Sequence, residues 1–160
     1  MEHVEHEFPP EYDGESRVLI LGSIPSPKSR EQGFYYGHPR NRFWSVLADV
    51  FGEEKPETVE ERKAFLHRNH IALWDVLASC EIKGAEDSSI QNPVANDLSE
   101  ILEAAPIERI YTTGGKAAAL YKRYCLPETG IEAVTLPSTS LANCGMKYET
   151  VREAYQRIRR

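Results

Sequence analysis

The chain has 160 residues, of which 41% are hydrophobic and 28% are charged, and its formal net charge is −6; this length is one ordinary domain with room for a sizeable core. No apolar run approaches the roughly 18–20 residues of a membrane span, and the acidic N-terminus lacks the basic and apolar parts of a secretory signal. We therefore expect a cytoplasmic protein with no membrane partner.

Apolar periodicity divides the chain into alternating strands and helices. Strands are expected over 16–23, 70–76, 107–115 and 131–140. Helices are expected over 41–51, from residue 58 onward, and over 98–105, 116–124 and 147–159. This alternation predicts a single α/β domain over 1–160, a three-layer α/β/α arrangement around a mostly parallel four-stranded sheet. The sequence does not decide whether residues 1–15 pack against this domain or form a loosely packed N-terminal arm.

Three polar loops follow strands of this sheet, over 23–41, 77–96 and 137–146. In open parallel sheets, ligands bind beyond the carboxyl ends of the strands. We therefore expect the three loops to converge into one site. The loop over 23–41 is long and yet aromatic, and loops of that length in compact domains are often functional.

Several common sites are excluded by their missing motifs. Gly22-Ser23-Ile24-Pro25 is not a G-x-G-x-x-G fingerprint, and Gly114-Gly115-Lys116 does not complete a Walker loop. A G-x-S-x-G nucleophile elbow is also missing. Nucleotide cofactors and serine hydrolysis therefore lose support.

The cysteines and histidines do not predict a metal site. Cys80, Cys125 and Cys144 are far apart and form no C-x-x-C pair, which excludes a zinc ribbon or a four-cysteine iron–sulfur cluster. The five histidines are scattered, and His38 alone falls in a candidate site. We expect free thiols, no metal and no other cofactor.

The net negative charge argues against a nucleic-acid partner, but the basic residues are clustered. Residues 28–42 contain four basic side chains and one acidic one, and residues 147–160 contain five basic against two acidic. Two such patches are compatible with phosphate binding, although plain solvated surface explains them equally well.

The stretch "YYGHPRNRFW" over 35–44 contains the residue of greatest interest, Asn41. Asn is a favoured helix N-cap, and the helical periodicity begins two residues later. The alternative is a chemical role for Asn41, because the loop that precedes it is rich in aromatic residues and aromatic rings stack on nucleobases. A pocket of Phe34, Tyr35 and Tyr36 could hold one extruded base.

Two motifs together resemble the uracil-DNA glycosylase superfamily. "GSIPSPKSREQGFYYGHPRNRFW" over 22–44 is similar to its first motif region, and "LPSTSLAN" over 136–143 to its second. The resemblance is strongest to the hypoxanthine-DNA glycosylase branch, which residues 77–98 also resemble, and next to the mismatch-specific uracil/thymine branch. The mismatch branch has a catalytic Asn in G-I-N-P where this chain has Ser23 or Ile24. The hypoxanthine branch uses the Asn of H-P-x-N, which is Asn41 here.

The resemblance implies a monofunctional DNA glycosylase that flips a deaminated base out of DNA and leaves an abasic site. Hypoxanthine is the first expectation, with uracil or xanthine possible. One alternative is removal of uracil or mismatched thymine, and another is a non-catalytic DNA- or nucleotide-binding module. The expected partner is DNA containing deaminated bases, bound by a monomer.

The resemblance also suggests a role for each candidate residue. Asn41 would orient the attacking water, Tyr36 or Phe34 would stack on the base, and Leu141 would fill the hole left in the duplex. The base pocket would comprise Gly22, Ser23, Phe34, Tyr36, His38, Ser89 and Asn92. The DNA-binding residues would be Ser138, Thr139, Ser140, Leu141, Asn143 and Lys147.

Overall fold

A parallel sheet of four strands runs through the centre of the computed structural model, which describes residues 1–159. Its strand order is β3-β2-β6-β7. The strands are β2 (Val18–Gly22), β3 (Ile71–Asp75), β6 (Arg109–Thr113) and β7 (Ala133–Leu136). All five residues of β2 are buried, as an apolar run covered on both faces requires. The predicted α/β class and four-stranded parallel sheet are confirmed.

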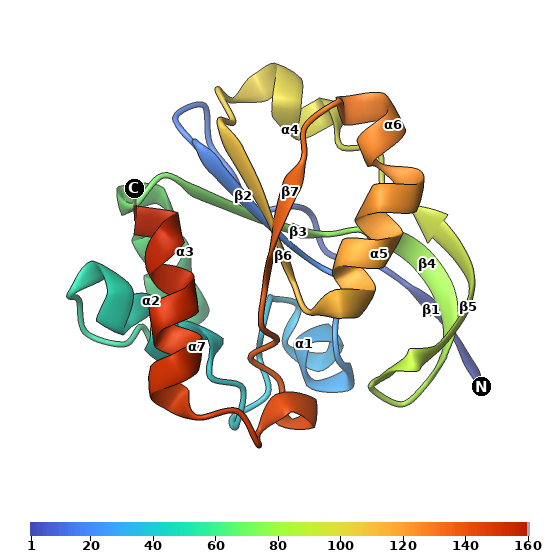
Figure 1. Cartoon of the computed structure of the whole chain (residues 1–160), viewed down its shortest axis with the longest axis horizontal. Helices are drawn as coiled ribbons and strands as arrows, with labels where there is room; N and C mark the ends of the chain where they lie inside the picture. The colour runs from blue at the N-terminus through green and yellow to red at the C-terminus, as the bar shows by residue number, and fades with distance from the viewer. Residues whose placement is uncertain (160) are drawn as a thin grey trace.

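Helices cover both faces of this sheet (Figure 1). In that view α2, α3 and α7 lie to the left of the strands, and α5 and α6 lie to the right. The helices are α1 (Pro27–Gln32), α2 (Phe43–Phe51), α3 (Val59–Arg68), α4 (Ser99–Ala104), α5 (Gly115–Tyr124), α6 (Leu126–Thr129) and α7 (Tyr148–Tyr155). Two 3₁₀ turns flank α7: η1 (Leu141–Asn143) precedes it and η2 (Gln156–Arg159) follows it. Helix α3 begins with a capping box formed by Thr58 and Glu61.

The segment over 77–96, predicted as a polar loop, is instead an antiparallel hairpin. It consists of β4 (Leu77–Lys83) and β5 (Glu86–Ala95), joined through Gly84 at a φ of 58°. Three register shifts interrupt the pairing. These shifts break the strict alternation of apolar and polar residues by which a strand is recognised in a sequence. The hairpin lies at the lower right of Figure 1.

The N-terminal segment, which the sequence left undecided, packs against both sheets. Strand β1 (Glu2–Glu5) pairs with β4 and completes a second sheet in the order β1-β4-β5. Glu11 exchanges two backbone hydrogen bonds of 2.9 Å with Leu73 of β3. The Tyr35 hydroxyl donates a hydrogen bond of 2.9 Å to the carbonyl of Pro9. Residues 2–11 are therefore an integral part of the fold.

Within residues 1–159, every helix is too short or too polar to cross a bilayer. Across the same residues, His, Cys, Asp and Glu side chains form no group of three or more that could hold a metal ion. Cys80 and Cys125 are buried free thiols, and Cys144 is exposed.

Helix α7 is tied to the end of β7 by a buried tyrosine. Tyr155 is fully buried, and its hydroxyl donates a hydrogen bond of 2.7 Å to the carbonyl of Pro137. Tyr155→Phe leaves that carbonyl unpaired, so we expect the free energy of unfolding to fall by about 1–3 kcal/mol in urea titrations. Tyr148→Phe, which removes an exposed bond to Asp49, is the control and should change stability by less than about 0.5 kcal/mol. Equal losses in the two variants would contradict this assignment.

Candidate active site

A cavity of about 1100 Å³ opens at the carboxyl ends of the parallel strands. Its walls come mainly from four segments, within 22–29, 84–88, 113–116 and 135–146. Figure 1 shows α1 and the chain after β7 close together at this lower end of the sheet. The three segments predicted as loops therefore meet in one place. The turn between β6 and α5 adds a fourth segment to the cavity wall.

Asn41 lies in the cavity wall immediately before α2. Its side-chain carbonyl accepts a hydrogen bond of 2.9 Å from the backbone N–H of Phe43. Its own backbone N–H donates to the carbonyl of His38. The boundary residue of the helix is Arg42, so the prediction of Asn41 as N-cap is wrong by one position. The Asn41 amide nevertheless takes up a free N–H of the first turn, which fixes its orientation at the cavity.

Tyr36 is held at both ends of its side chain. Its ring stacks on Phe43, with centroids 3.7 Å apart and planes 12° from parallel. Its hydroxyl is 3.3 Å from the Thr113 hydroxyl. The backbone of Tyr36 has a φ of 53°, which is uncommon for a bulky residue. Burial raises the pKa of this hydroxyl well above its usual value, so the group stays neutral. The result is a fixed aromatic wall of the cavity.

The segment 138–143 forms a self-bonded loop beside the cavity. The Ser138 hydroxyl donates to the Ser140 hydroxyl at 2.9 Å and accepts from the Ser140 backbone N–H at 3.1 Å. The Asn143 amide donates to the carbonyl of Ser138 at 2.9 Å. Among residues 1–159, the buried hydroxyl of Thr139 has no hydrogen-bond partner. These four residues line the cavity, and their own bonds hold the loop in shape.

Arg42 connects this loop to the start of α2. The sequence showed it only as one of the basic residues of 28–42, and its contacts were not expected. Its backbone N–H donates to the carbonyl of Thr139 at 3.0 Å. Its guanidinium donates to the carbonyls of Met146 at 2.8 Å and Asn143 at 3.0 Å. Because all three bonds go to protein carbonyls, Arg42 acts as a clamp between the two motifs.

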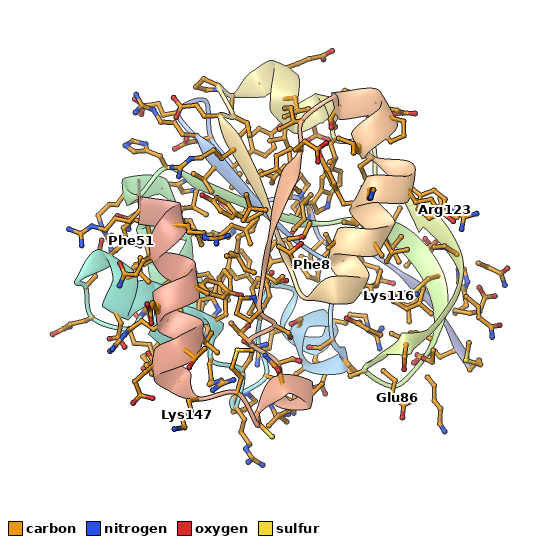
Figure 2. The ribbon with its side chains drawn as sticks, viewed as in Figure 1. Phe8, Phe51, Glu86, Lys116, Arg123 and Lys147 are labelled. Carbon is orange, nitrogen blue, oxygen red and sulfur yellow. The ribbon has the colours of Figure 1, made fainter. Side chains whose placement is uncertain are left out.

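Two predicted DNA contacts lie at the surface beside the cavity. Leu141 is 37% exposed and begins the short turn η1. Lys147 is exposed and sits at the N-terminal boundary of α7. Figure 2 shows Lys147 at the lower left, well apart from Glu86 at the lower right and Lys116 at the right.

Two of the predicted base-pocket residues in the first motif lie elsewhere. Phe34 is 3% exposed and packs in the core, nearly parallel to Trp44 at 6.2 Å. His38 lines a smaller neighbouring pocket, where its Nδ1 accepts a hydrogen bond from the backbone N–H of Arg40. The left-handed conformation of Tyr36 separates the directions of these neighbouring side chains, and a sequence pattern does not reveal it.

Two more predicted pocket residues, on the hairpin, are also misplaced. The Ser89 hydroxyl is used within the hairpin, donating to the carbonyl of Glu86 and accepting from the N–H of Lys83. Asn92 lies in a separate surface pocket with Arg123 and Tyr124. Both errors follow from treating the hairpin as a loop. Gly22 and Ser23 do line the main cavity, as predicted.

The carboxyl groups of Asp75 and Asp87 in the cavity wall were not recognised as site residues from the sequence. Asp75 ends β3, and Asp87 lies near the start of β5. The Ser23 hydroxyl donates to Asp87 at 2.8 Å. Burial raises the pKa of Asp87, an effect that the Ser23 hydrogen bond partly offsets and the nearby Asp75 carboxyl increases. In the sequence, Asp75 falls at the end of an apolar strand and Asp87 is one of several polar residues in a predicted loop, so neither stands out.

Gly22 is required where β2 reaches the cavity. A Cβ atom at this position would lie 2.5 Å from Oδ1 of Asp75 and 3.4 Å from the Tyr36 hydroxyl. The absence of a side chain therefore allows the carboxylate and the phenol to come together beside the strand.

Comparisons with known proteins agree on one family. Residues 9–159 match the model of the uracil DNA glycosylase superfamily. A relative from Methanosarcina acetivorans named hypoxanthine DNA glycosylase is 37% identical over 137 residues, which cover 85% of this chain and 86% of the relative. A relative of the same name from Methanosarcina barkeri is 36% identical over the same shares. The solution NMR structure of a candidate uracil DNA glycosylase from M. acetivorans superposes with a TM-score of 0.79 at 32% identity, covering 96% of this chain and 97% of that one.

The raised pKa of Asp87 leads to a test by pH. Because the folded protein binds the Asp87 proton more tightly than the unfolded chain, stability falls as pH rises from the unfolded pKa, about 3.9, through the higher folded pKa. Asp87→Asn removes this cost. We expect the variant to be more stable than the wild type at pH 7, with the advantage shrinking toward pH 4 in urea titrations. An advantage that grew on acidification would contradict the raised pKa.

Proposed function

Because the chain belongs to the uracil DNA glycosylase superfamily, we propose that it removes a deaminated base, hypoxanthine first, from DNA and leaves an abasic site. Two relatives that are 37% and 36% identical to it over 137 residues carry the name hypoxanthine DNA glycosylase. The observation that carries the proposal is the position of Asn41, fixed by its bond to Phe43 of α2 in the wall of the cavity that Tyr36 also lines.

The cavity suits a base that has been flipped out of the duplex. Tyr36 offers an aromatic surface that its contacts with Phe43 and Thr113 keep in place. Leu141 is exposed on a turn at the rim, where an apolar side chain can replace the extruded base in the stack. Lys147 and the loop over 138–143 would contact the phosphates.

The reaction needs a positioned water and a stabilised leaving group. The Asn41 carbonyl oxygen accepts one bond from Phe43 and has a second lone pair for a water. That water attacks C1′ of the sugar, the N-glycosidic bond breaks with its electron pair on the base, and the proton of the water passes to solvent or to the departing base. The positive end of the α2 dipole lies beside this site and favours the developing negative charge.

Excision assays test the function directly. Duplexes carrying a single deoxyinosine should yield abasic sites that alkali cleaves, and undamaged duplexes should not. Release of uracil without release of hypoxanthine would make the uracil or mismatched-thymine activity the correct one. A protein that binds these duplexes but releases neither base would be a binding module.

Asn41→Ser separates the structural role of this residue from its chemical one. A serine hydroxyl can also accept the N–H of the residue two positions later, so the melting temperature should stay near that of the wild type. The water loses its orienting amide, and we expect single-turnover excision to fall on the order of 10²–10³-fold. Unchanged excision would leave Asn41 with only its structural role.

A further inference from the structure

Asp87 lies in the cavity wall with one carboxyl oxygen engaged and the other available. Its side chain is half-buried near the start of β5, and the Ser23 hydroxyl donates to Oδ1 at 2.8 Å. Among residues 1–159, this hydroxyl is the hydrogen-bond partner of the carboxyl group, and Oδ2 has none. A protonated carboxyl group has one O–H donor beside its accepting oxygen. Because Oδ1 already accepts from Ser23, the proton of a neutral Asp87 belongs on Oδ2.

The surroundings of Asp87 favour that neutral form. Four titratable side chains of other elements lie near enough to interact with it electrostatically, and they are Asp75, Tyr36, Cys80 and Lys116. Burial is the largest effect and raises the pKa of Asp87, and the Asp75 carboxyl raises it further. The Ser23 hydrogen bond and the Lys116 ammonium lower this pKa, but they do not cancel the rise. The pKa values of Tyr36 and Cys80 are themselves raised, so both groups stay neutral beside Asp87.

A purine leaving group has an atom that can use such a proton. When the bond between C1′ and N9 of deoxyinosine breaks, its electron pair spreads over the five-membered ring to N7, which carries a lone pair. A proton delivered to N7 makes the departing hypoxanthine neutral, so no anion has to be stabilised. Uracil has no five-membered ring and therefore no equivalent atom. Proton donation by a positioned acid contributes typically about 10²–10⁴-fold to a rate.

We propose that Asp87 is a further catalytic residue, a general acid that donates its Oδ2 proton to N7 of the departing hypoxanthine, and that Ser23 is its positioning residue. This inference rests on the proposed function and assigns the site to purine substrates. As the bond from C1′ to N9 breaks, the O–H bond of Asp87 breaks and an N7–H bond forms, which leaves a carboxylate and a neutral base. The water that attacks C1′ releases its proton to solvent, and solvent returns a proton to Asp87 after the base has left.

The first experiment measures single-turnover excision of hypoxanthine at saturating enzyme from about pH 5 to about pH 8. A general acid is present below its folded pKa and is lost above it, so the wild-type rate should fall about tenfold per pH unit on the alkaline side. Asp87→Asn keeps an acceptor for Ser23 but has no proton to give. Its rate should be independent of pH and at least about 10²-fold below the wild type at the acid end, with a normal melting temperature.

The second experiment tests Ser23 and supplies a matched control. Ser23→Ala removes the hydrogen bond that lowers the pKa of Asp87, so the midpoint of the pH profile should move to higher pH. A merely structural role of Ser23 would lower the rate without moving the midpoint. Glu81→Gln removes a carboxyl group of β4 in the same hairpin, outside the cavity wall, and should keep the wild-type rate and profile.

The third experiment changes the base at the atom that receives the proton. In 7-deazahypoxanthine a C–H group replaces N7, and Asp87 has no lone pair to protonate. The wild type should release this base at least about 10²-fold more slowly than hypoxanthine from the same duplex. Release within about 10-fold of hypoxanthine would overturn N7 as the proton acceptor.

The outcomes separate this inference from the function on which it rests. A wild type that excises hypoxanthine at a rate independent of pH, or an Asp87→Asn variant that keeps the wild-type rate or its pH dependence, would overturn the role of Asp87 alone. An unmoved midpoint in Ser23→Ala would overturn the positioning role. A wild type that releases no base from any duplex would overturn the proposed function, and this inference with it.

Discussion

The clamp made by Arg42 is the interaction on which the site depends. Its bonds to the carbonyls of Thr139, Asn143 and Met146 connect segments about a hundred positions apart in the chain. The two hydrogen bonds from its guanidinium have a charged donor, and such bonds contribute about 1.5–3 kcal/mol each. Since the loop after β7 has only one short 3₁₀ turn of its own, the clamp sets where that loop stands relative to Asn41. Asn41, the residue proposed to orient the water, and the loop of the second motif are thus held as one unit.

The negative net charge of the protein does not conflict with a DNA partner once the positions of its carboxyl groups are considered. Asp75 and Asp87 lie inside the cavity, where a base would face them and the phosphates would not. Asp75 is bonded to His6, and burial favours the neutral form of Asp87. Lys147 lies outside, beside the exposed turn of the second motif. A net charge of −6 is therefore compatible with DNA binding, because two of the carboxyl groups lie inside the cavity, away from the phosphates.

The strands and main helices could be predicted because their apolar periodicity reports burial directly, and the rule for parallel sheets then located the site. Sequence patterns failed where a side chain's direction depends on tertiary contacts. The φ of Tyr36 separates it from Phe34, and the register shifts in β4 and β5 hid a hairpin. His6 and Asp75 are separated by 69 positions, and the pairing of β1 with β4 and the bridge between Glu11 and Leu73 bring them together.

The second sheet fixes the position of Asp87, which lies in β5, and of His6, which is bonded to Asp75. Strand β1 pairs with β4 in register from Glu2–Ile82 to Glu5–Ser79, and the backbone N–H of His6 continues this ladder to Ala78. The hairpin that carries Asp87 and the segment that carries His6 are therefore fixed to each other by the same hydrogen bonds. A shift of β1 by one residue would turn the His6 ring to the opposite face and leave Asp75 buried without its partner. An unpaired buried charge is costly, so the need to satisfy Asp75 itself helps to select the register of the N-terminal strand.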